Sequence, residues 1–196
     1  MIAAGKLILD SRSFIELIPI LNTSKPAGQW LFFSSPSAVA LFMSQHALEG
    51  EKIGVIGSGT ASRLRSFGVE PDFEPRSTEP ETAVEAFARA VKPGEHVIYA
   101  TSNKSLNRLS AVFDSKNLIH WPFYTNTRRE NTTPSQAPIL VFTSPSNAVN
   151  YFGSHRKRPD QKVIAIGKST ASALAENGVR VDAISEAPSE EKIWKA

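Results

Sequence analysis

The sequence contains no cysteine in its 196 residues. This excludes disulfides, thiolate metal ligands and cysteine nucleophiles together. No apolar run approaches the roughly 20 residues that a membrane-spanning helix needs. The N-terminal residues 1–6 also lack the basic start and apolar core of a signal peptide. We therefore expect a cytoplasmic protein that does not associate with a membrane.

Cofactor and metal motifs are lacking as well. The four histidines are dispersed and form no metal-binding spacing. The turn 57–59 is not a dinucleotide-binding fingerprint, because Ser62 stands where the third glycine belongs. The run 167–169 resembles the end of a phosphate-binding loop, but Lys162 replaces the glycine that opens such a loop. We expect no metal and no organic cofactor.

The sequence is mildly basic, with a formal net charge of +3. Its charges are scattered, and residues 156–158 (Arg-Lys-Arg) form the one compact basic run. The sequence lacks the interleaved aromatic and basic residues that would indicate a nucleic-acid partner, so we expect none. A mildly basic surface suits an anionic small molecule.

The chain carries an internal repeat. Residues 53–72 (IGVIGSGTASRLRSFGVEPD) match residues 163–182 (VIAIGKSTASALAENGVRVD) at nine positions, at a constant offset of 110. About one or two matches are expected by chance. Upstream, residues 30–37 (WLFFSSPS) correspond to residues 140–146 (LVFTSPS), and Asn147 is interpreted as one extra residue at the second turn.

Each copy predicts alternating strands and helices, which is typical of parallel α/β sheets with right-handed crossovers. Short apolar runs predict buried strands, Ser-Pro predicts a strand end and a helix start, and glycine predicts a helix end. The expected elements are a strand (31–33 or 139–142), a helix (38–48 or 148–152), a strand (52–56 or 162–166), a helix from Thr60 or Thr170 to Gly68 or Gly178, and a strand from Val69 or Val179.

Hydroxyl side chains gather at the turns that follow these strands. Ligands of parallel sheets bind at the carboxyl ends of strands, where helix N-termini attract carboxylate or phosphate. The alternative is that these residues are ordinary helix N-caps. Four equivalent turns in two copies favour a shared anion-binding cleft. The candidates are Ser34, Ser35, Ser37, Thr60, Thr143, Ser144, Ser146 and Thr170.

The doubled order Phe-Ser/Thr-Ser-Pro-Ser, Ala-Val, Ile-Gly-x-x-Thr-Ala-x-x-Leu, Gly-Val resembles the uroporphyrinogen-III synthase family, from about Leu7 to Ala187. The resemblance implies two pseudo-repeated, flavodoxin-like α/β domains with parallel sheets, joined by a two-stranded connector. Residues 1–18 and 138–196 would form one domain and residues 29–117 the other. Residues 19–28 and 118–137 would connect them.

The same resemblance implies a cyclising lyase of tetrapyrrole biosynthesis. Its substrate is hydroxymethylbilane, which closes to uroporphyrinogen III with loss of water and inversion of ring D. Tyr124 matches the family's cleft tyrosine and is our candidate for assisting loss of the hydroxyl; the alternative is a packing tyrosine. Ser102 and Asn147 join the substrate-binding candidates. The alternative function is a catalytically impaired module that binds a tetrapyrrole or another polyanion.

Two departures from the family pattern concern the ends of the chain. Residues 1–5 correspond to the end of the family's first helix, so we expect a strand to be missing and a sheet edge to be open. Residues 193–196 stop within the expected last helix. We expect a monomer, with a dimer through that edge as the alternative. In the other domain, a strand at 97–100 leads to a helix through Leu109, and the turn's basic residue is displaced to Lys104 or Arg108.

Overall fold

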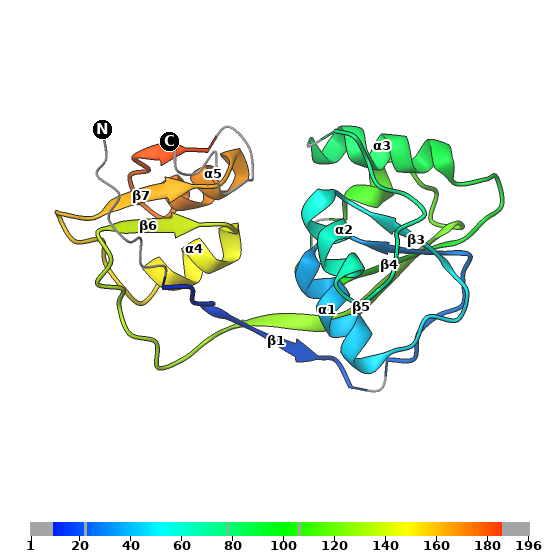
Figure 1. The fold of residues 1–196 in the computed structure, drawn as a ribbon, viewed down its shortest axis with the longest axis horizontal. Coiled ribbons are helices and arrows are strands. Elements are labelled where there is room, and N and C mark those ends of the chain that lie inside the picture. Colours follow the sequence, from blue (N-terminus) through cyan, green and yellow to red (C-terminus); the bar gives the residue numbers. More distant parts are fainter. Residues whose placement is uncertain (1–9, 22, 78, 106, 186–196) are drawn as a thin grey trace. The chain divides into compact units, whose positions relative to one another are not determined.

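The computed structural model describes residues 10–21, 23–77, 79–105 and 107–185 (Figure 1). The expectations about residues 1–5 and 193–196 lie outside these ranges. The chain divides into two compact units. The inserted unit is Leu17–Asn126, and the terminal unit holds the residues up to Glu16 and from Thr127 onward.

The inserted unit contains a five-stranded sheet in the order β1-β5-β4-β2-β3. Strand β2 pairs in parallel with β3 and with β4, and β4 pairs in parallel with β5. Ile20 N donates to Phe123 O and Arg129 N donates to Phe14 O, so β1 runs antiparallel to β5. The strands are β1 (Ile15–Pro19), β2 (Trp30–Phe33), β3 (Lys52–Val55), β4 (Val97–Ser102) and β5 (Leu118–Arg128).

Both faces of this sheet are covered, which explains why β2 and β4 are buried along their whole length and β2 is apolar throughout. Helices α1 (Pro36–Gln45) and α2 (Ser58–Arg65) pack against one face through a core that includes Phe33 and Phe42. Helix α3 (Pro80–Ala90) and a 3-10 turn (Arg108–Ala111) cover the other face (Figure 1).

The terminal unit has a smaller parallel sheet, in the order β6-β7-β8. Its helices α4 and α5 share one core with the sheet, and the fully buried Tyr151 belongs to that core. Among the described residues, β6 has a single strand neighbour, β7. The elements are β6 (Ile139–Phe142), α4 (Pro145–Phe152), β7 (Lys162–Ala165), α5 (Lys168–Glu176) and β8 (Ala183–Ile184). The expected α/β class with parallel sheets is thus confirmed.

Helix ends follow the sequence signals closely. Gly68 and Gly178 adopt positive φ angles of 77° and 72°, the left-handed conformation that ends helices and that glycine adopts without steric cost. Helices α2 and α5 begin at Ser58 and Lys168, two residues before the threonines that were expected to open them.

The strands expected from Val69 and Val179 are wrong. The first is reduced to a single bridge between Gly54 and Phe73, and the second to the two-residue β8. Instead, Asp72 accepts a hydrogen bond from Ile53 N, and Asp182 accepts one from Val163 N, each at 2.8 Å. Each carboxylate accepts from a backbone N–H that a strand beginning at Val69 or Val179 could otherwise have paired with.

The helix expected through Leu109 is also wrong, because only the 3-10 turn Arg108–Ala111 forms there. Ser102 Oγ accepts from Lys104 N at 3.3 Å, and Ser105 Oγ accepts from Ser102 N at 3.2 Å. Hydroxyl groups that bind nearby backbone N–H groups stabilise a turn in place of a helix.

The extra residue of the second copy is not Asn147. The N-cap serines Ser35 and Ser144 are 109 residues apart, and the same offset relates the buried Phe42 to Tyr151. It also relates His46 to His155, whose N–H groups bind Phe42 O and Tyr151 O. Strands β3 and β7 are offset by 110, so the additional residue lies in the loop after His155.

Candidate functional site

Two consecutive serines follow β2, and each lies near a tyrosine. Tyr99 donates its hydroxyl proton to Ser34 Oγ at 3.1 Å. The Ser35 side chain lowers the pKa of the Tyr124 phenol. Tyr99 packs in the core on the α3 face of the sheet, whereas Tyr124 packs in the core on the α1 face. The two tyrosines next to this turn therefore lie on opposite faces of the sheet.

A bulge in β5 sets the direction of Tyr124. Thr101 pairs with Pro122, but the next residue, Ser102, pairs with Tyr124, so Phe123 is an additional residue in β5. A bulge of this kind re-aims the side chains that follow it. Phe123 and Tyr124 consequently both join the core on the α1 face, although they are neighbours in sequence.

The environment of Tyr124 keeps its phenol protonated at neutral pH. Burial is the main effect and raises the pKa of Tyr124, the Ser35 side chain lowers it, and the nearby Tyr99 raises it. The net result is a raised pKa. The side chain is 4% exposed. A protonated phenol can donate a hydrogen bond or a proton to a reacting group.

Among the other candidates in the inserted unit, Ser102 is the last residue of β4 and lies beside β5. It pairs in register with Tyr124, is 2% exposed, and its Oγ lies 3.0 Å from Ser105 Oγ. Ser37 is exposed in the first turn of α1, and Thr60 is buried in the first turn of α2. The carboxyl ends of β2 and β4 and the middle of β5 thus hold Ser34, Ser35, Ser102 and Tyr124.

In the terminal unit, the equivalent turn is organised around Asn147. Ser144 Oγ accepts from both Asn147 N and Asn147 Nδ2 at 3.2 Å. Asn147 Oδ1 accepts from Phe14 N at 2.7 Å, which ties the chain before β1 to α4. Thr143 and Ser146 are exposed, and Thr170 is 1% exposed in the first turn of α5.

Sequence reasoning missed Tyr99 and Thr101. Both lie in β4, and Thr101 Oγ1 is one of the buried polar atoms that have no hydrogen-bond partner within the described residues. Their positions in the sequence could have revealed them. Tyr99 and Thr101 alternate with the core residues Ile98 and Ala100 near the carboxyl end of an apolar run, so they face the other side of the sheet.

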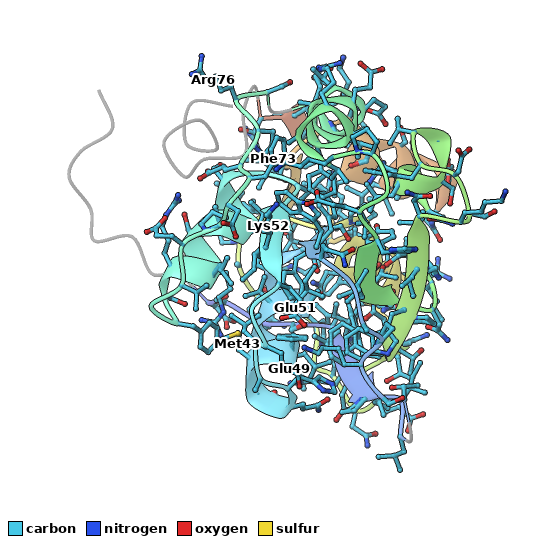
Figure 2. The ribbon with its side chains drawn as sticks, turned by 90° about the vertical axis from the view of Figure 1, so that its right-hand side faces the viewer. Met43, Glu49, Glu51, Lys52, Phe73 and Arg76 are labelled. Atoms are coloured by element: carbon cyan, nitrogen blue, oxygen red, sulfur yellow. The ribbon has the colours of Figure 1, made fainter. Side chains whose placement is uncertain are left out.

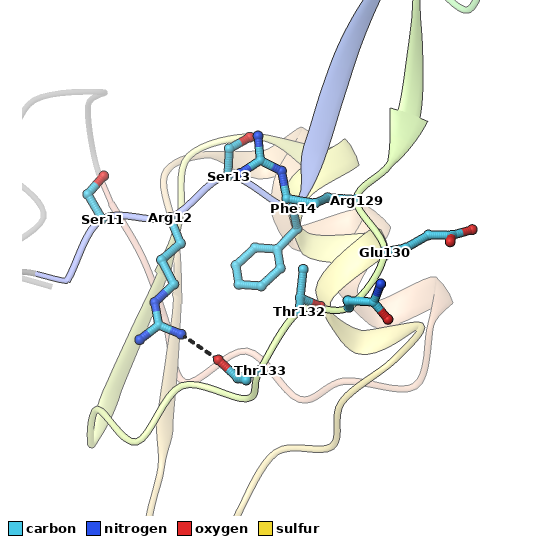
Figure 3. A pocket seen from close by; sticks show the side chains of 9 residues that line it. Ser11, Arg12, Ser13, Phe14, Arg129, Glu130, Thr132 and Thr133 are labelled. Carbon is cyan, nitrogen blue, oxygen red and sulfur yellow. Dashed lines mark hydrogen bonds between the residues drawn. The ribbon is translucent and has the colours of Figure 1, made fainter.

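A shallow pocket of about 350 Å³ lies in the terminal unit, lined by residues 11–14 and 129–133 (Figure 3). Arg12 donates to Thr133 Oγ1 at 3.0 Å and forms an ion pair with Asp10 at 2.6 Å. The sequence did not point to this pocket, because residues 11–14 were assigned to a domain and residues 129–133 to a connector.

The described part of the chain contains no group of three or more histidine, aspartate or glutamate residues arranged to hold a metal ion. Nor does any helix in those ranges have the length and apolar character needed to cross a membrane. The polar groups that the structure gathers are hydroxyls and backbone N–H groups, which suit hydrogen bonding to an anionic or hydroxylated ligand.

Comparison with known sequences agrees with this geometry. The family model described as uroporphyrinogen-III synthase HemD matches residues 10–195. A uroporphyrinogen-III synthase from Chlorobaculum parvum is 26% identical over 201 residues, covering 88% of this chain and 80% of that protein. A porphyrin biosynthesis protein HemD from Ruminiclostridium josui is 25% identical over 194 residues, and these cover 85% of this chain but only 38% of that longer protein.

Solved structures show the same fold. The crystal structure of uroporphyrinogen-III synthetase from Helicobacter pylori superimposes with a TM-score of 0.71, at 19% identity, over 93% of this chain and 88% of that chain. A mutant uroporphyrinogen III synthase from Thermus thermophilus gives a TM-score of 0.53 at 14% identity, over 93% of this chain and 84% of that chain.

Proposed function

The chain belongs to the uroporphyrinogen-III synthase family, cyclising lyases of tetrapyrrole biosynthesis, and from that premise we propose that it closes hydroxymethylbilane to uroporphyrinogen III. The reaction loses water and inverts ring D. The observation that carries the proposal is the family match over residues 10–195, which includes both Ser-Pro turns and Tyr124.

We assign Tyr124 as the proton donor. When the terminal C–O bond of the substrate breaks, the oxygen leaves with the bonding electron pair and needs a proton to depart as water. The Tyr124 phenol supplies that proton and becomes phenolate. It recovers a proton when the substituted pyrrole carbon loses one and the ring regains aromaticity. No oxidant or reductant enters the balance, and the protonated state of Tyr124 at neutral pH supports the assignment.

The hydroxyl-rich turns would receive the acetate and propionate groups of the substrate. The candidates remain Ser34, Ser35, Ser37, Thr60, Ser102, Thr143, Ser144, Ser146, Asn147 and Thr170. Helices α1 and α4 support this role, since each presents a capped N-terminus at such a turn. Thr60 and Thr170 are buried, so the backbone N–H groups of their turns are better placed than their side chains to meet an anion.

The two-domain pseudo-repeat is part of the same proposal. We propose one domain from residues 1–18 and 138–196 and another from residues 29–117, joined by connectors at 19–28 and 118–137. Two matched contacts support a duplicated origin. Asp72 and Asp182 bind the first buried residues of β3 and β7 in the same way, and Ser35 and Ser144 cap α1 and α4 in the same way. We further propose a cytoplasmic monomer, in line with the absence of cysteine.

A coupled assay tests the function. Porphobilinogen and hydroxymethylbilane synthase supply the substrate, and the product isomers are oxidised and separated by chromatography. We expect isomer III in the presence of this protein and isomer I, the uninverted product of spontaneous closure, in its absence. Isomer I alone at every protein concentration would reject the enzyme in favour of a binding module.

Replacement of Tyr124 by Phe tests the proton donor. Loss of a general acid lowers kcat by about 100-fold to 10,000-fold. Tyr151→Phe is the matched control, because it removes a phenol that accepts a hydrogen bond from Ser135 N in the terminal unit. We expect Tyr151→Phe to retain normal turnover. If Tyr124→Phe turns over at the normal rate, Tyr124 is not the proton donor. The lyase activity itself would not be contradicted by that result.

A further inference from the structure

We propose that Tyr99 is a positioning residue for substrate binding: its phenol fixes the Ser34 hydroxyl, so that Ser34 donates its proton to a carboxylate of the substrate. This inference rests on the proposed function and deepens it. It adds Tyr99 to the residues that serve the substrate, and it gives Ser34 a task that distinguishes it from the other binding candidates.

Tyr99 is held firmly by the core around it. It lies in β4, which pairs with β2 on one side and with β5 on the other, and the residue is 3% exposed. The Tyr99 ring packs edge-to-face against Phe32 of β2 and His120 of β5, with ring centroids 6.0 Å and 5.6 Å away. A closely packed interior holds such a ring in one orientation, so the Tyr99 hydroxyl is a fixed point.

The hydrogen bond from Tyr99 determines what the Ser34 hydroxyl can do. Tyr99 donates its proton to Ser34 Oγ at 3.1 Å. A serine hydroxyl has one proton of its own and two acceptor lone pairs. Tyr99 occupies a lone pair, and no described residue accepts the Ser34 proton, so that proton is available to a ligand. Accepting the bond also polarises the Ser34 hydroxyl and makes it a stronger donor.

Ser34 stands where a ligand can reach it. It follows the last residue of β2 and is half-buried. Ligands of parallel sheets bind at the carboxyl ends of the strands. Helix α1 begins two residues later, and its aligned peptide dipoles favour negative charge there. An ionised carboxylate accepts hydrogen bonds and donates none, so it fits a hydroxyl whose proton is unused.

Three other serines among the candidates serve the backbone instead. Ser35 and Ser144 cap α1 and α4 by accepting from backbone N–H groups. Ser102 also accepts from a backbone N–H and is 2% exposed. The hydroxyl of Ser34 differs from these three, because its orientation is set by a side chain of the core.

The terminal unit lacks this arrangement. Thr143 follows β6 as Ser34 follows β2, and it is exposed. Among the described residues β6 pairs with β7 alone, so no strand there corresponds to β4 and no residue corresponds to Tyr99. An oriented hydroxyl at this turn is therefore a property of the inserted unit.

Two substitutions, assayed with hydroxymethylbilane, test the pair. We expect Ser34→Ala to raise KM about 10-fold or more, because a hydrogen bond to a carboxylate is lost. Tyr99→Phe should raise KM about 3-fold to 10-fold, because Ser34 keeps its hydroxyl but loses its orientation. In both variants kcat should stay within about 3-fold of the parent protein, since this carboxylate is bound equally in the ground state and the transition state.

The double variant tests whether Tyr99 acts through Ser34. We expect Tyr99→Phe to raise KM no further in a Ser34→Ala background, because the group it positions is gone. Ser34→Thr retains a hydroxyl and should restore KM to within about 3-fold of the parent value. Tyr151→Phe removes a phenol from the terminal unit and is the control. An unchanged KM in Tyr99→Phe would overturn the inference, and so would an equal rise in both backgrounds or a loss confined to kcat.

A binding measurement separates this inference from the proposed reaction. Trp30 and Trp121 lie in β2 and β5, so stopped-flow quenching of tryptophan fluorescence by hydroxymethylbilane gives a Kd before the substrate reacts. We expect Ser34→Ala and Tyr99→Phe to raise this Kd as they raise KM. If the parent protein binds the bilane but forms no isomer III, and both variants weaken binding, the reaction fails while the positioning role stands. Equal affinity in the parent and both variants, or no binding by the parent, would overturn the inference.

Discussion

Strands β2 and β6 occupy the same place in their units but have different surroundings. β2 lies between β3 and β4, and helices cover both faces of its sheet. β6 pairs with β7 alone among the described residues, and Ile139 at its start is 42% exposed. In those residues no helix of the terminal unit corresponds to α3.

This difference shows which features a short repeat carries by itself. Caps, helix-ending glycines and the two aspartate contacts are formed by residues close in sequence or within one strand–helix step, and they recur in both units. Features that need β4 and β5 beside β2, or a second helix layer, occur among the described residues in the inserted unit alone. The catalytic candidate Tyr124 belongs to this second group, because β5 and its bulge position it.

The largest expected effect concerns the matched aromatic residues Phe42 and Tyr151. Both are essentially buried, and replacement by Ala removes a large side chain from a packed core, which costs about 4 kcal/mol. We expect hydrogen exchange to show lost protection in the unit that carries the substitution. Loss of protection in both units from either variant would contradict the division into separate cores.

The next comparison sets Glu51 against Asp160. Glu49 and Glu51 lie just before β3 (Figure 2). Lys25 forms ion pairs with both, and the side chains of Lys25 and Glu51 are 9% and 7% exposed. Arg158 pairs with Asp160 before β7, but that aspartate side chain is 65% exposed. We expect Glu51→Gln to cost about 3 kcal/mol in urea unfolding, because it leaves Lys25 buried with a weaker partner.

Asp160→Asn is the control for that experiment. An exposed ion pair contributes about 0–1 kcal/mol, so we expect a small change. A loss in Asp160→Asn as large as that in Glu51→Gln would show that burial does not distinguish the two loops.

Gly68 and Gly178 should behave alike. A Cβ atom at either position meets no heavy atom within 4 Å, so the cost of alanine comes from its positive φ alone. We expect Gly68→Ala and Gly178→Ala each to lower the free energy of unfolding by about 1 kcal/mol. A difference of more than about 1 kcal/mol between them, measured by urea denaturation, would show that the helix ends are supported differently.

The last comparison concerns the pH dependence of stability and involves Glu95. Its carboxylate accepts hydrogen bonds from Lys92 N, Trp30 Nε1 and Lys52 Nζ, and these lower its pKa to about 2. A carboxyl group whose pKa is lower in the folded state stabilises the fold above its unfolded pKa, and this contribution is lost as pH falls toward 2. We expect Glu95→Gln to flatten the decline of the thermal midpoint between pH 4.5 and pH 2.

Asp182 supplies the counterpart in the terminal unit. The backbone N–H of Val163 and then Lys157 lower its pKa, so its contribution is also lost in acid. Asp182→Asn should flatten the acid response of the terminal unit, as followed by hydrogen exchange. An acid response of the terminal unit that stays unchanged in Asp182→Asn would contradict this expectation.

The sequence allowed the local features to be predicted. The strands at β2, β3, β6 and β7, the helix-ending glycines and the parallel α/β class all follow from residue types at short spacing. Helix α3 has no counterpart in the repeat, so comparison within the chain gives no indication of it. The position of the extra residue was wrong because sequence identity placed it at Asn147, whereas burial and capping place it after His155.

The candidate site was predictable in part. The turns were found because serine before proline has a local cause, and the assignment of Tyr124 came from family resemblance. The hydrogen bond between Tyr99 and Ser34, and the face on which Tyr124 lies, were not predictable. The first joins residues 65 positions apart in the chain, and the second depends on Phe123 standing outside the register of β4 and β5.

The extra residue in β5 determines on which face of the sheet the Tyr124 phenol lies. Along a regular strand, side chains alternate between the two faces, so inserting or removing one residue exchanges them for everything that follows. If Phe123 instead paired regularly opposite Ser102, the phenol of Tyr124 would be carried to the α3 face, where Tyr99 and Ser34 already pair. Loss of the bulge, with every residue kept, would thus move the proposed proton donor to the other face of the sheet.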